Sequence, residues 1–177
     1  DYKPENYSYT LEDAITGQQK LFGIMNDKLY EIDENDLLKQ AVKPLNKEQK
    51  FFSNAILQDN IDVVVVDAKA GSGKTLLALS AGMRLVRLKK YNKIIYIRNS
   101  IESTDKGEEV GFLSGNDEKF AIYNHPLMDS LRYIARSESK KSKANTPKSR
   151  AENKEQEEAI DSKVEGYIKD YNIETMW

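Results

Sequence analysis

The sequence predicts an α/β fold in which a parallel sheet is flanked by helices. Residues 62–66 (Asp-Val-Val-Val-Val) form a nearly continuous β-branched run, which is typical of a strand buried on both faces of a parallel sheet. A glycine-containing loop and a helical stretch over residues 75–88 follow, and residues 93–98 form a second β-type run. This order predicts a strand, a crossover helix and a second parallel strand, joined with the right-handed sense of such connections.

The N-terminal extension, residues 1–43, is predicted to form a short antiparallel element instead. Two β-type runs, at residues 20–25 and 28–32, flank Asn26-Asp27, a pair that favours a tight turn. The extension is therefore expected to contain a β-hairpin that lies outside the parallel sheet.

The predicted core, residues 44–135, begins with a helix. Pro44 separates this helix from the extension, and Asn46 is expected to cap its first turn with the side-chain oxygen. Its apolar residues fall on one face, as expected of a helix that covers a core. These residues are Phe51, Phe52, Ala55 and Ile56.

The C-terminal part is predicted to be loop-rich and then strongly charged. Residues 99–124 contain three glycines and are expected to be a loop, and His125 is expected to shape or cap a helix that starts at Pro126. Residues 136–158 carry a basic run followed by an acidic one, which indicates a flexible segment or an exposed charged helix. Residues 159–177 are predicted to form a helix leading toward a further part of the core.

Length and composition exclude several kinds of protein. With 177 residues, the chain has room for one domain or for one domain and an appendage. The sequence has no cysteine and a single histidine, which excludes disulfide scaffolds, thiolate zinc sites and multi-histidine metal sites made by one chain. No apolar run reaches the roughly 20 residues that span a bilayer, and no signal peptide is evident, so a soluble, cytoplasmic protein without a membrane partner is expected.

The segment Ala68–Thr75 (Ala-Lys-Ala-Gly-Ser-Gly-Lys-Thr) carries the most specific motif. It matches the phosphate-binding loop G-x-x-x-x-G-K-[ST], except that Ala68 replaces the first glycine. Gly71 and Gly73 allow positive φ angles, so that backbone N–H groups can form a cradle for an anion. An empty glycine-rich turn is the alternative, but a loop between a buried-type strand and a long helix is the context in which this motif binds phosphate.

The two residues that end the motif carry the chemistry of a nucleotide site. Lys74 is expected to place a full positive charge on the β- and γ-phosphates, and the Thr75 hydroxyl is expected to bind Mg²⁺. Both residues open the predicted helix, whose N-terminus adds a partial positive charge.

Beyond the loop, the sequence resembles the PhoH-like family of ATPases. Four blocks carry the resemblance, and together they cover roughly residues 44–134 in the order of the family. They are Pro44–Phe52, Asp67–Leu79, Lys93–Ser100 and Lys106–Lys119. The resemblance implies an incomplete RecA-like P-loop NTPase fold, related to superfamily 1 helicase cores, with ATP and Mg²⁺ as cofactors. The implied ATP-binding residues are Gln49, Ala70, Gly71, Ser72, Gly73, Lys74, Thr75 and Leu76.

The resemblance also implies roles for residues outside the loop. Gln49 occupies the place of a glutamine that reads the adenine edge in related helicase cores, although a solvated position on a helix is the alternative. Arg98 and Asn99, at the end of the second predicted strand, correspond to a segment near nucleic acid or phosphate, although Arg98 could equally form a salt bridge. The basic run 136–150 could bind RNA as an arm or act as a solubilising linker without aromatic residues for base stacking.

An ATPase of this type needs an apolar run ending in Asp-Glu, which would hold Mg²⁺ and activate the attacking water. No such run follows Thr75, and the only later β-type run ends in Arg98. Because the chain also begins at Asp1 rather than Met, we expect a fragment that binds ATP but hydrolyses it poorly. The parent protein is expected to be an ATPase that acts on RNA or single-stranded DNA, with a ring-shaped homo-oligomer as one arrangement. The alternatives are a non-enzymatic nucleotide-binding module and a P-loop phosphotransferase.

Overall fold

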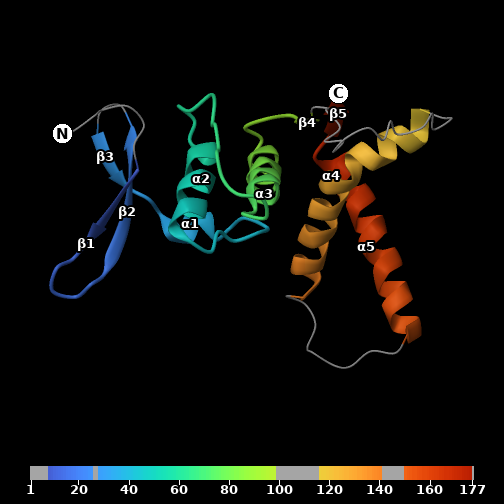
Figure 1. Cartoon of the computed structure of the whole chain (residues 1–177), viewed down its shortest axis with the longest axis horizontal. Helices are drawn as coiled ribbons and strands as arrows, with labels where there is room; N and C mark the ends of the chain where they lie inside the picture. The colour runs from blue at the N-terminus through green and yellow to red at the C-terminus, as the bar shows by residue number, and fades with distance from the viewer. Residues whose placement is uncertain (1–7, 26–27, 99–115, 141–149, 177) are drawn as a thin grey trace, which may run out of the picture. The chain divides into compact units, whose positions relative to one another are not determined.

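The chain forms two compact units, residues 1–84 and 85–177, and each is described here by itself (Figure 1). The computed structural model describes residues 8–25, 28–98, 116–140 and 150–176. The two units contain different kinds of sheet: a three-stranded antiparallel sheet in the first and a two-stranded parallel sheet in the second.

The antiparallel sheet lies at the N-terminal end and has the order β1-β2-β3. Its strands are β1 (Tyr9–Glu12), β2 (Gln19–Met25) and β3 (Lys28–Glu31). Strands β2 and β3 pair in a register that places Met25 opposite Lys28, which confirms the predicted hairpin. The turn Asn26-Asp27 lies outside the described residues.

Strand β1 was not predicted from the sequence. It pairs with β2 through a local turn in which the Asp13 carboxylate accepts backbone N–H groups from Ile15 at 2.9 Å and Thr16 at 2.8 Å. Gly17 completes the turn with a φ of +67°, a conformation that glycine adopts without strain. The N–H groups of Thr16 and Ile15 hold the pKa of Asp13 below its ordinary value, because they stabilise the ionised carboxylate.

Two short helices complete the core beside this sheet: α1 (Glu34–Leu37) and α2 (Lys47–Leu57). Asn46 caps α2 as predicted, since its side chain accepts the N–H of Gln49 at 2.9 Å. Leu21, Ile32 and Leu37 form a buried apolar cluster. Partly buried side chains pack against this cluster from the sheet and from α2, namely Tyr30, Phe51 and Leu57.

Helix α3 (Lys74–Arg87) starts at the end of the glycine loop, close to the predicted bounds. Two contacts tie it to the segment between the sheet and α2. The Arg84 guanidinium donates to both carboxylate oxygens of Asp36 at 2.7 Å, and the Val42 N–H donates to the Ser80 hydroxyl at 2.9 Å. The helix that follows the loop is thereby anchored to the N-terminal part of its unit.

The predicted strand over residues 62–66 is wrong for this structure, because the segment has no regular secondary structure. Val63 is 76% exposed and Val65 is 90% exposed, rather than buried on both faces of a sheet. A parallel strand needs a hydrogen-bonded neighbour, and no strand in the described part of the chain pairs with this run. The predicted strand–helix–strand crossover is therefore absent from the described residues.

The parallel sheet of the second unit joins segments that lie far apart in the sequence. Strand β4 (Ile94–Ile97) was predicted, but its partner β5 (Ile173–Met176) forms where the sequence predicted a helix continuing to residue 177. Ile94 lies opposite Ile173, and the Lys93 ammonium pairs with the Glu174 carboxylate at 2.9 Å. Pairing with a distant strand, rather than local periodicity, decides the conformation of β5.

Two long helices, α4 (Asn116–Lys140) and α5 (Arg150–Asp170), pack against each other in the second unit (Figure 1). The predicted loop over 99–124 is wrong from Asn116 onward, and His125 and Pro126 lie inside α4 rather than at its start. A proline costs a helix one hydrogen bond, and the buried residues that follow it offset this loss. These residues, with their partners on α5, are Leu127, Leu131, Ile134, Ala135, Ile160, Val164 and Tyr167.

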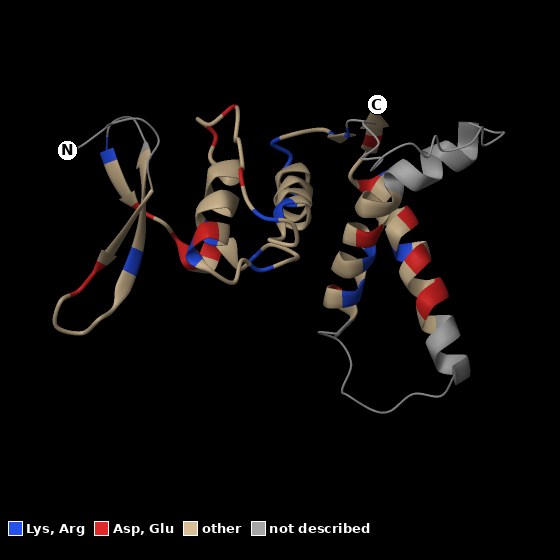
Figure 2. Cartoon of the chain, viewed as in Figure 1, with Lys and Arg blue, Asp and Glu red and all other residues tan. Residues whose placement is uncertain are grey.

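Basic and acidic residues lie on both α4 and α5 (Figure 2), and ion pairs between them link the two helices. Arg132 donates to Asp161 at 2.9 Å, and Lys163 pairs with Glu138 at 3.0 Å. The middle of the predicted charged segment, residues 141–149, lies outside the described residues. Within the described helices, none is both long and apolar enough to pass through a membrane.

Candidate functional site

The glycine loop of the first unit leads directly into the N-terminus of α3. Gly71 has a φ of +77° and Gly73 a φ of +85°, so both glycines of the motif adopt the left-handed conformation that it requires. A Cβ atom at Gly71 would meet no heavy atom within 4 Å, so the backbone angle rather than crowding favours glycine there. Left-handed residues next to residues with negative φ can direct successive backbone N–H groups toward one anion.

Lys74 folds back over this loop. Its ammonium group donates to the carbonyl oxygens of Ala68 at 2.5 Å and Lys69 at 2.8 Å, and it lies 3.5 Å from the Ser72 hydroxyl. All three partners are uncharged, so the positive charge of Lys74 has no carboxylate among these contacts. An anion placed over the loop would meet this uncompensated charge.

The start of α3 supplies the other groups that an anion needs. The first N–H groups of an α-helix have no partner within the helix, and the helix dipole places partial positive charge at the same end. Lys74, Thr75 and Leu76 form the first turn of α3, and Thr75 is exposed. The ammonium, the helix end and the hydroxyl fit a nucleotide phosphate with its Mg²⁺, since these groups pair with anionic oxygens and with a hard cation.

Gln49 lies against the same loop, although it belongs to α2. Its Nε2 donates to the carbonyl oxygen of Ser72 at 3.1 Å, and its Oε1 accepts the N–H of Leu45 at 2.7 Å. That Gln49 reads the adenine edge of a nucleotide stays a prediction. In this structure its side-chain amide bonds the backbone at both of its ends.

The comparison with known families rests on most of the chain. The profile of the PhoH-like protein family matches residues 41–176, which include the loop, Gln49 and both strands of the parallel sheet. The chain belongs to the PhoH-like family. This family consists of P-loop ATPases, which agrees with the fit of the loop to a nucleotide phosphate.

Curated PhoH-like relatives are considerably longer than this chain. Protein PhoH2 of Bacillus subtilis is 33% identical over 96 residues, covering 53% of this chain and 21% of the relative. The PhoH-like protein of Mycobacterium leprae is 34% identical over 119 residues, covering 65% of this chain and 33% of the relative. The PhoH-like protein of Mycobacterium tuberculosis H37Rv is 33% identical over 115 residues, covering 63% of this chain and 31% of the relative. No solved structure gives a significant match to this chain.

The residues predicted to contact nucleic acid lie in the second unit of this PhoH-like chain. Arg98 is exposed, and its N–H continues the ladder of the parallel sheet by donating to the Met176 carbonyl at 3.4 Å. Asn99 lies outside the described residues, as do most residues of the basic run 136–150. Arg98 therefore directly follows β4, whereas the predicted strand ended at this residue.

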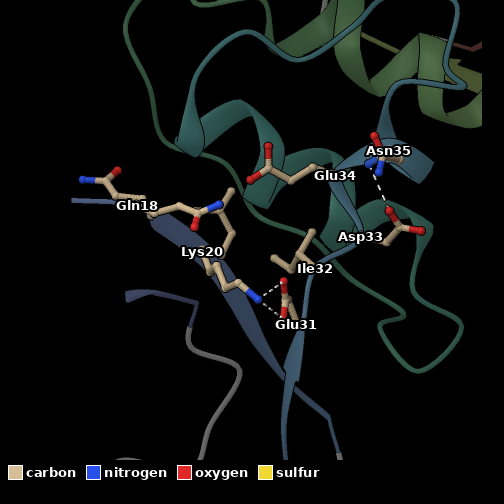
Figure 3. A pocket seen from close by; sticks show the side chains of 9 residues that line it. Gln18, Lys20, Glu31, Ile32, Asp33, Glu34 and Asn35 are labelled. Carbon is tan, nitrogen blue, oxygen red and sulfur yellow. Dashed lines mark hydrogen bonds and ion pairs between the residues drawn. The ribbon is translucent and has the colours of Figure 1, made fainter. Parts of the chain in front are cut away.

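A cavity elsewhere in the first unit is a weaker candidate for function (Figure 3). It lies between β2 and the segment that joins β3 to α1, and Glu31, Asp33 and Glu34 line it. All three carboxylates already have partners: Lys20 pairs with Glu31, backbone N–H groups bond Asp33, and Lys50 pairs with Glu34. This cavity is built around internal ion pairs and does not include the phosphate loop.

Two clusters of ionisable groups stabilise the units rather than form a site. The Arg84 guanidinium holds the pKa of Asp36 below its ordinary value, in spite of the opposing effect of partial burial. Burial and the hydrogen bond to the Glu138 carboxylate raise the pKa of Tyr167, whose hydroxyl lies 2.5 Å from Glu138. Burial by itself would raise the pKa of Glu138, but the hydrogen bonds from Tyr167 and Lys163 outweigh it and the pKa is lowered.

Sequence reasoning missed the contacts that surround the loop. The spacing Asn46-x-x-Gln49 resembles a capping box, in which the residue three positions after the cap bonds the backbone just before the helix. The Gln49 bond to the Leu45 N–H is of this kind, one residue further out. This spacing was the available signal. The anchor between Arg84 and Asp36 joins residues 48 positions apart and left no local signal.

Proposed function

We propose that this chain is the nucleotide-binding part of a PhoH-like ATPase that binds Mg²⁺-ATP through residues 68–76. The observation that carries the proposal is the position of Lys74, whose ammonium lies over a loop with two left-handed glycines at the N-terminus of a 14-residue helix. Family membership supports the same chemistry.

Each residue of the loop has a distinct role in this proposal. Lys74 exchanges the carbonyls of Ala68 and Lys69 for the β- and γ-phosphate oxygens, a stronger charge-assisted interaction. Gly71 and Gly73 allow the backbone to approach the phosphates without a clash. The Thr75 hydroxyl and the phosphates would hold Mg²⁺, which when bound neutralises negative charge as the terminal phosphate leaves.

Hydrolysis requires carboxylates that residues 76–177 do not supply in the expected form. This part of the sequence contains no apolar run ending in Asp-Glu. We therefore propose that this chain by itself binds nucleotide and turns it over slowly, and that the whole protein hydrolyses it. The chain spans 21–33% of the length of relatives that belong to the same family.

We further propose that the whole protein couples hydrolysis to the remodelling of RNA or single-stranded DNA. An exposed arginine at the end of a parallel strand can bind phosphate, and Arg98 occupies such a position. Asn99 and the basic run 136–150 are proposed to contribute to the same surface. A homo-oligomeric ring, in which neighbouring subunits complete each other's sites, belongs to this proposal.

Nucleotide binding can be tested on this chain with a fluorescent ATP analogue and Mg²⁺. We expect saturable binding that Lys74→Ala abolishes, because the substitution removes the only full positive charge that the described contacts place over the loop. Lys43→Ala is the matched control, since it removes the same charge from an exposed lysine that lies outside the loop. Equal binding by the wild type and Lys74→Ala would refute the proposed site.

Turnover separates the enzyme from a non-enzymatic nucleotide-binding module, which is the second candidate. The missing Asp-Glu run favours this module for the chain taken alone. Phosphate release by the full-length protein, measured with and without poly-U RNA and single-stranded DNA, should be stimulated by one of these polymers. Hydrolysis without stimulation would support the proposed ATPase activity and contradict the proposed coupling to nucleic acid. If the full-length protein hydrolysed no ATP, the non-enzymatic binding module would be favoured.

A further inference from the structure

We propose that Gln49 is a positioning residue that fixes the direction of the peptide group between Ser72 and Gly73, and that it acts on the phosphates rather than on the base. This inference rests on the proposed nucleotide binding. It differs from the predicted role of Gln49 as a reader of adenine, because it requires no contact between Gln49 and the nucleotide.

The contact is a direct hydrogen bond to the loop backbone. Gln49 Nε2 donates to the Ser72 carbonyl oxygen at 3.1 Å. The peptide bonds of the described chain are trans, and in a trans peptide the C=O and the following N–H point in opposite directions. Holding the Ser72 carbonyl toward Gln49 therefore turns the Gly73 N–H away from Gln49, and this N–H belongs to the part of the loop that bonds phosphate.

The other end of the Gln49 amide is held as well. Oε1 accepts the Leu45 N–H at 2.7 Å, and the backbone N–H of Gln49 donates to the Asn46 side chain at 2.9 Å. An amide that bonds a donor on one side and an acceptor on the other has a single satisfactory orientation. The Leu45 N–H, just before α2, thus fixes the orientation of the Gln49 side chain independently of its bond to the loop.

The space around Gly73 supports the same role. A Cβ atom added at Gly73 would lie 3.5 Å from Gln49 Nε2, so the amide packs directly beside this glycine. With a φ of +85°, Gly73 has a conformation that glycine adopts without strain and that other residues rarely adopt. Gln49 holds this side of the loop from α2, while Lys74 contacts the carbonyls on the upstream side of the loop.

The test compares ligands with and without a base. Binding of Mg²⁺-ATP, Mg²⁺-GTP and Mg²⁺-tripolyphosphate to the 177-residue chain is measured by titration calorimetry for the wild type and Gln49→Met. Methionine keeps an unbranched side chain of similar length and adds no charge next to the phosphates. We expect all three ligands to bind about threefold to tenfold more weakly, which corresponds to the loss of one hydrogen bond.

Gln58→Met is the matched control on the other end of α2. Gln58 follows this helix and bonds Asn54 at 3.1 Å, so its replacement should leave all three affinities unchanged. A loss confined to ATP in Gln49→Met would show that Gln49 reads adenine and would overturn the positioning role. Unchanged affinities for all three ligands would overturn it as well.

Leu45→Pro provides a second test if Gln49→Met does not fold. It removes the N–H that Gln49 Oε1 accepts but keeps the Gln49 side chain, and the Leu45 side chain that it replaces is 85% exposed. The positioning role predicts equal weakening of all three ligands, whereas a base reader would keep its preference for ATP and its affinity for tripolyphosphate. If the wild type binds no ligand and equals Lys74→Ala, the proposed function fails and this inference fails with it.

Discussion

The two sheets of this chain form by different routes. All three strands of the antiparallel sheet lie within residues 9–31, and each strand pairs with the strand next to it in the sequence. The parallel sheet joins residues 94–97 to residues 173–176, with both long helices in between. A third β-type run, residues 62–66, has no partner among the described strands.

This difference shows how much a strand depends on its neighbours. An antiparallel hairpin needs only a short turn, which nearby residues such as Asp13 and Gly17 can build. A parallel strand needs a partner that a long connection must bring back, so even a run of four valines has no regular secondary structure without one, and Val63 and Val65 are exposed. Substitutions at paired and unpaired positions should therefore differ in their cost, and the largest effect is expected in the packed core.

A charge placed in the core should be far more costly than a charge in the unpaired run. We expect Val164→Asp to reduce the free energy of unfolding by about 3–5 kcal/mol, because Val164 is 1% exposed between α4 and α5. Val65→Asp should change it by no more than about 0.5 kcal/mol, because Val65 is 90% exposed. Urea unfolding followed by circular dichroism measures both, and a large loss in Val65→Asp would show that this run is packed.

The antiparallel sheet should depend on its buried face. Leu21→Ala is expected to cost about 2–5 kcal/mol, because Leu21 is 5% exposed and contributes to the cluster with Ile32 and Leu37. Leu11→Ala on β1 is the control, with an expected cost below about 1 kcal/mol at 51% exposure. Hydrogen exchange of the β2 amides should report the same order, and equal effects would contradict the assigned core.

The anchor between Asp36 and Arg84 should make the first unit sensitive to acid. Since Arg84 lowers the pKa of Asp36 in the folded state, the stabilisation is fully present above the unfolded pKa of about 4 and is lost as the pH falls through the lower folded value. Asp36→Asn should cost about 1–2 kcal/mol at neutral pH, because the Asp36 side chain is partly exposed.

Thermal unfolding between pH 2 and pH 7 checks this sign. The melting temperature of the wild type should fall toward that of Asp36→Asn at the acid end, so that the difference between the two proteins disappears. A constant difference across the whole range would show that the ion pair does not carry the effect.

The ion pair that borders the parallel sheet should contribute least. The side chains of Lys93 and Glu174 are 44% and 40% exposed, so a double-mutant cycle with alanine should give a coupling of about 0.2–1 kcal/mol. The coupling should vanish in 1 M salt, where the screening length falls to about 3 Å. A larger or salt-resistant coupling would mean that this pair, rather than backbone pairing, holds β4 to β5.

Much of the first unit could be predicted because its signals are local. The hairpin, the Asn46 cap, the glycine loop and α3 each depend on residues that are close together in the sequence. The positive φ angles of Gly71 and Gly73 and the place of Lys74 at the start of α3 could be predicted for the same reason, since one short segment contributes all three residues.

The remaining elements depend on contacts between distant parts of the chain. Strand β5 has little β-type pattern of its own and exists through pairing with β4. Helix α4 continues through Pro126 because its buried face packs on α5, which a proline rule applied to the local sequence cannot reveal. The capping-box spacing indicates the bond between Gln49 and the Leu45 N–H. It does not indicate the bond from Gln49 to the Ser72 carbonyl, because these two residues are 23 positions apart.

The exposed valine run has a practical consequence for work with this chain. A β-branched segment with exposed valines and no neighbouring strand is open to strand addition, and such segments promote aggregation between identical molecules. Loss of soluble material on concentration is therefore the behaviour to expect, and it should begin at residues 62–66 rather than at the paired strands of the antiparallel sheet. A charge at Val65 would act as a gatekeeper and keep samples dispersed without disturbing the phosphate loop that follows.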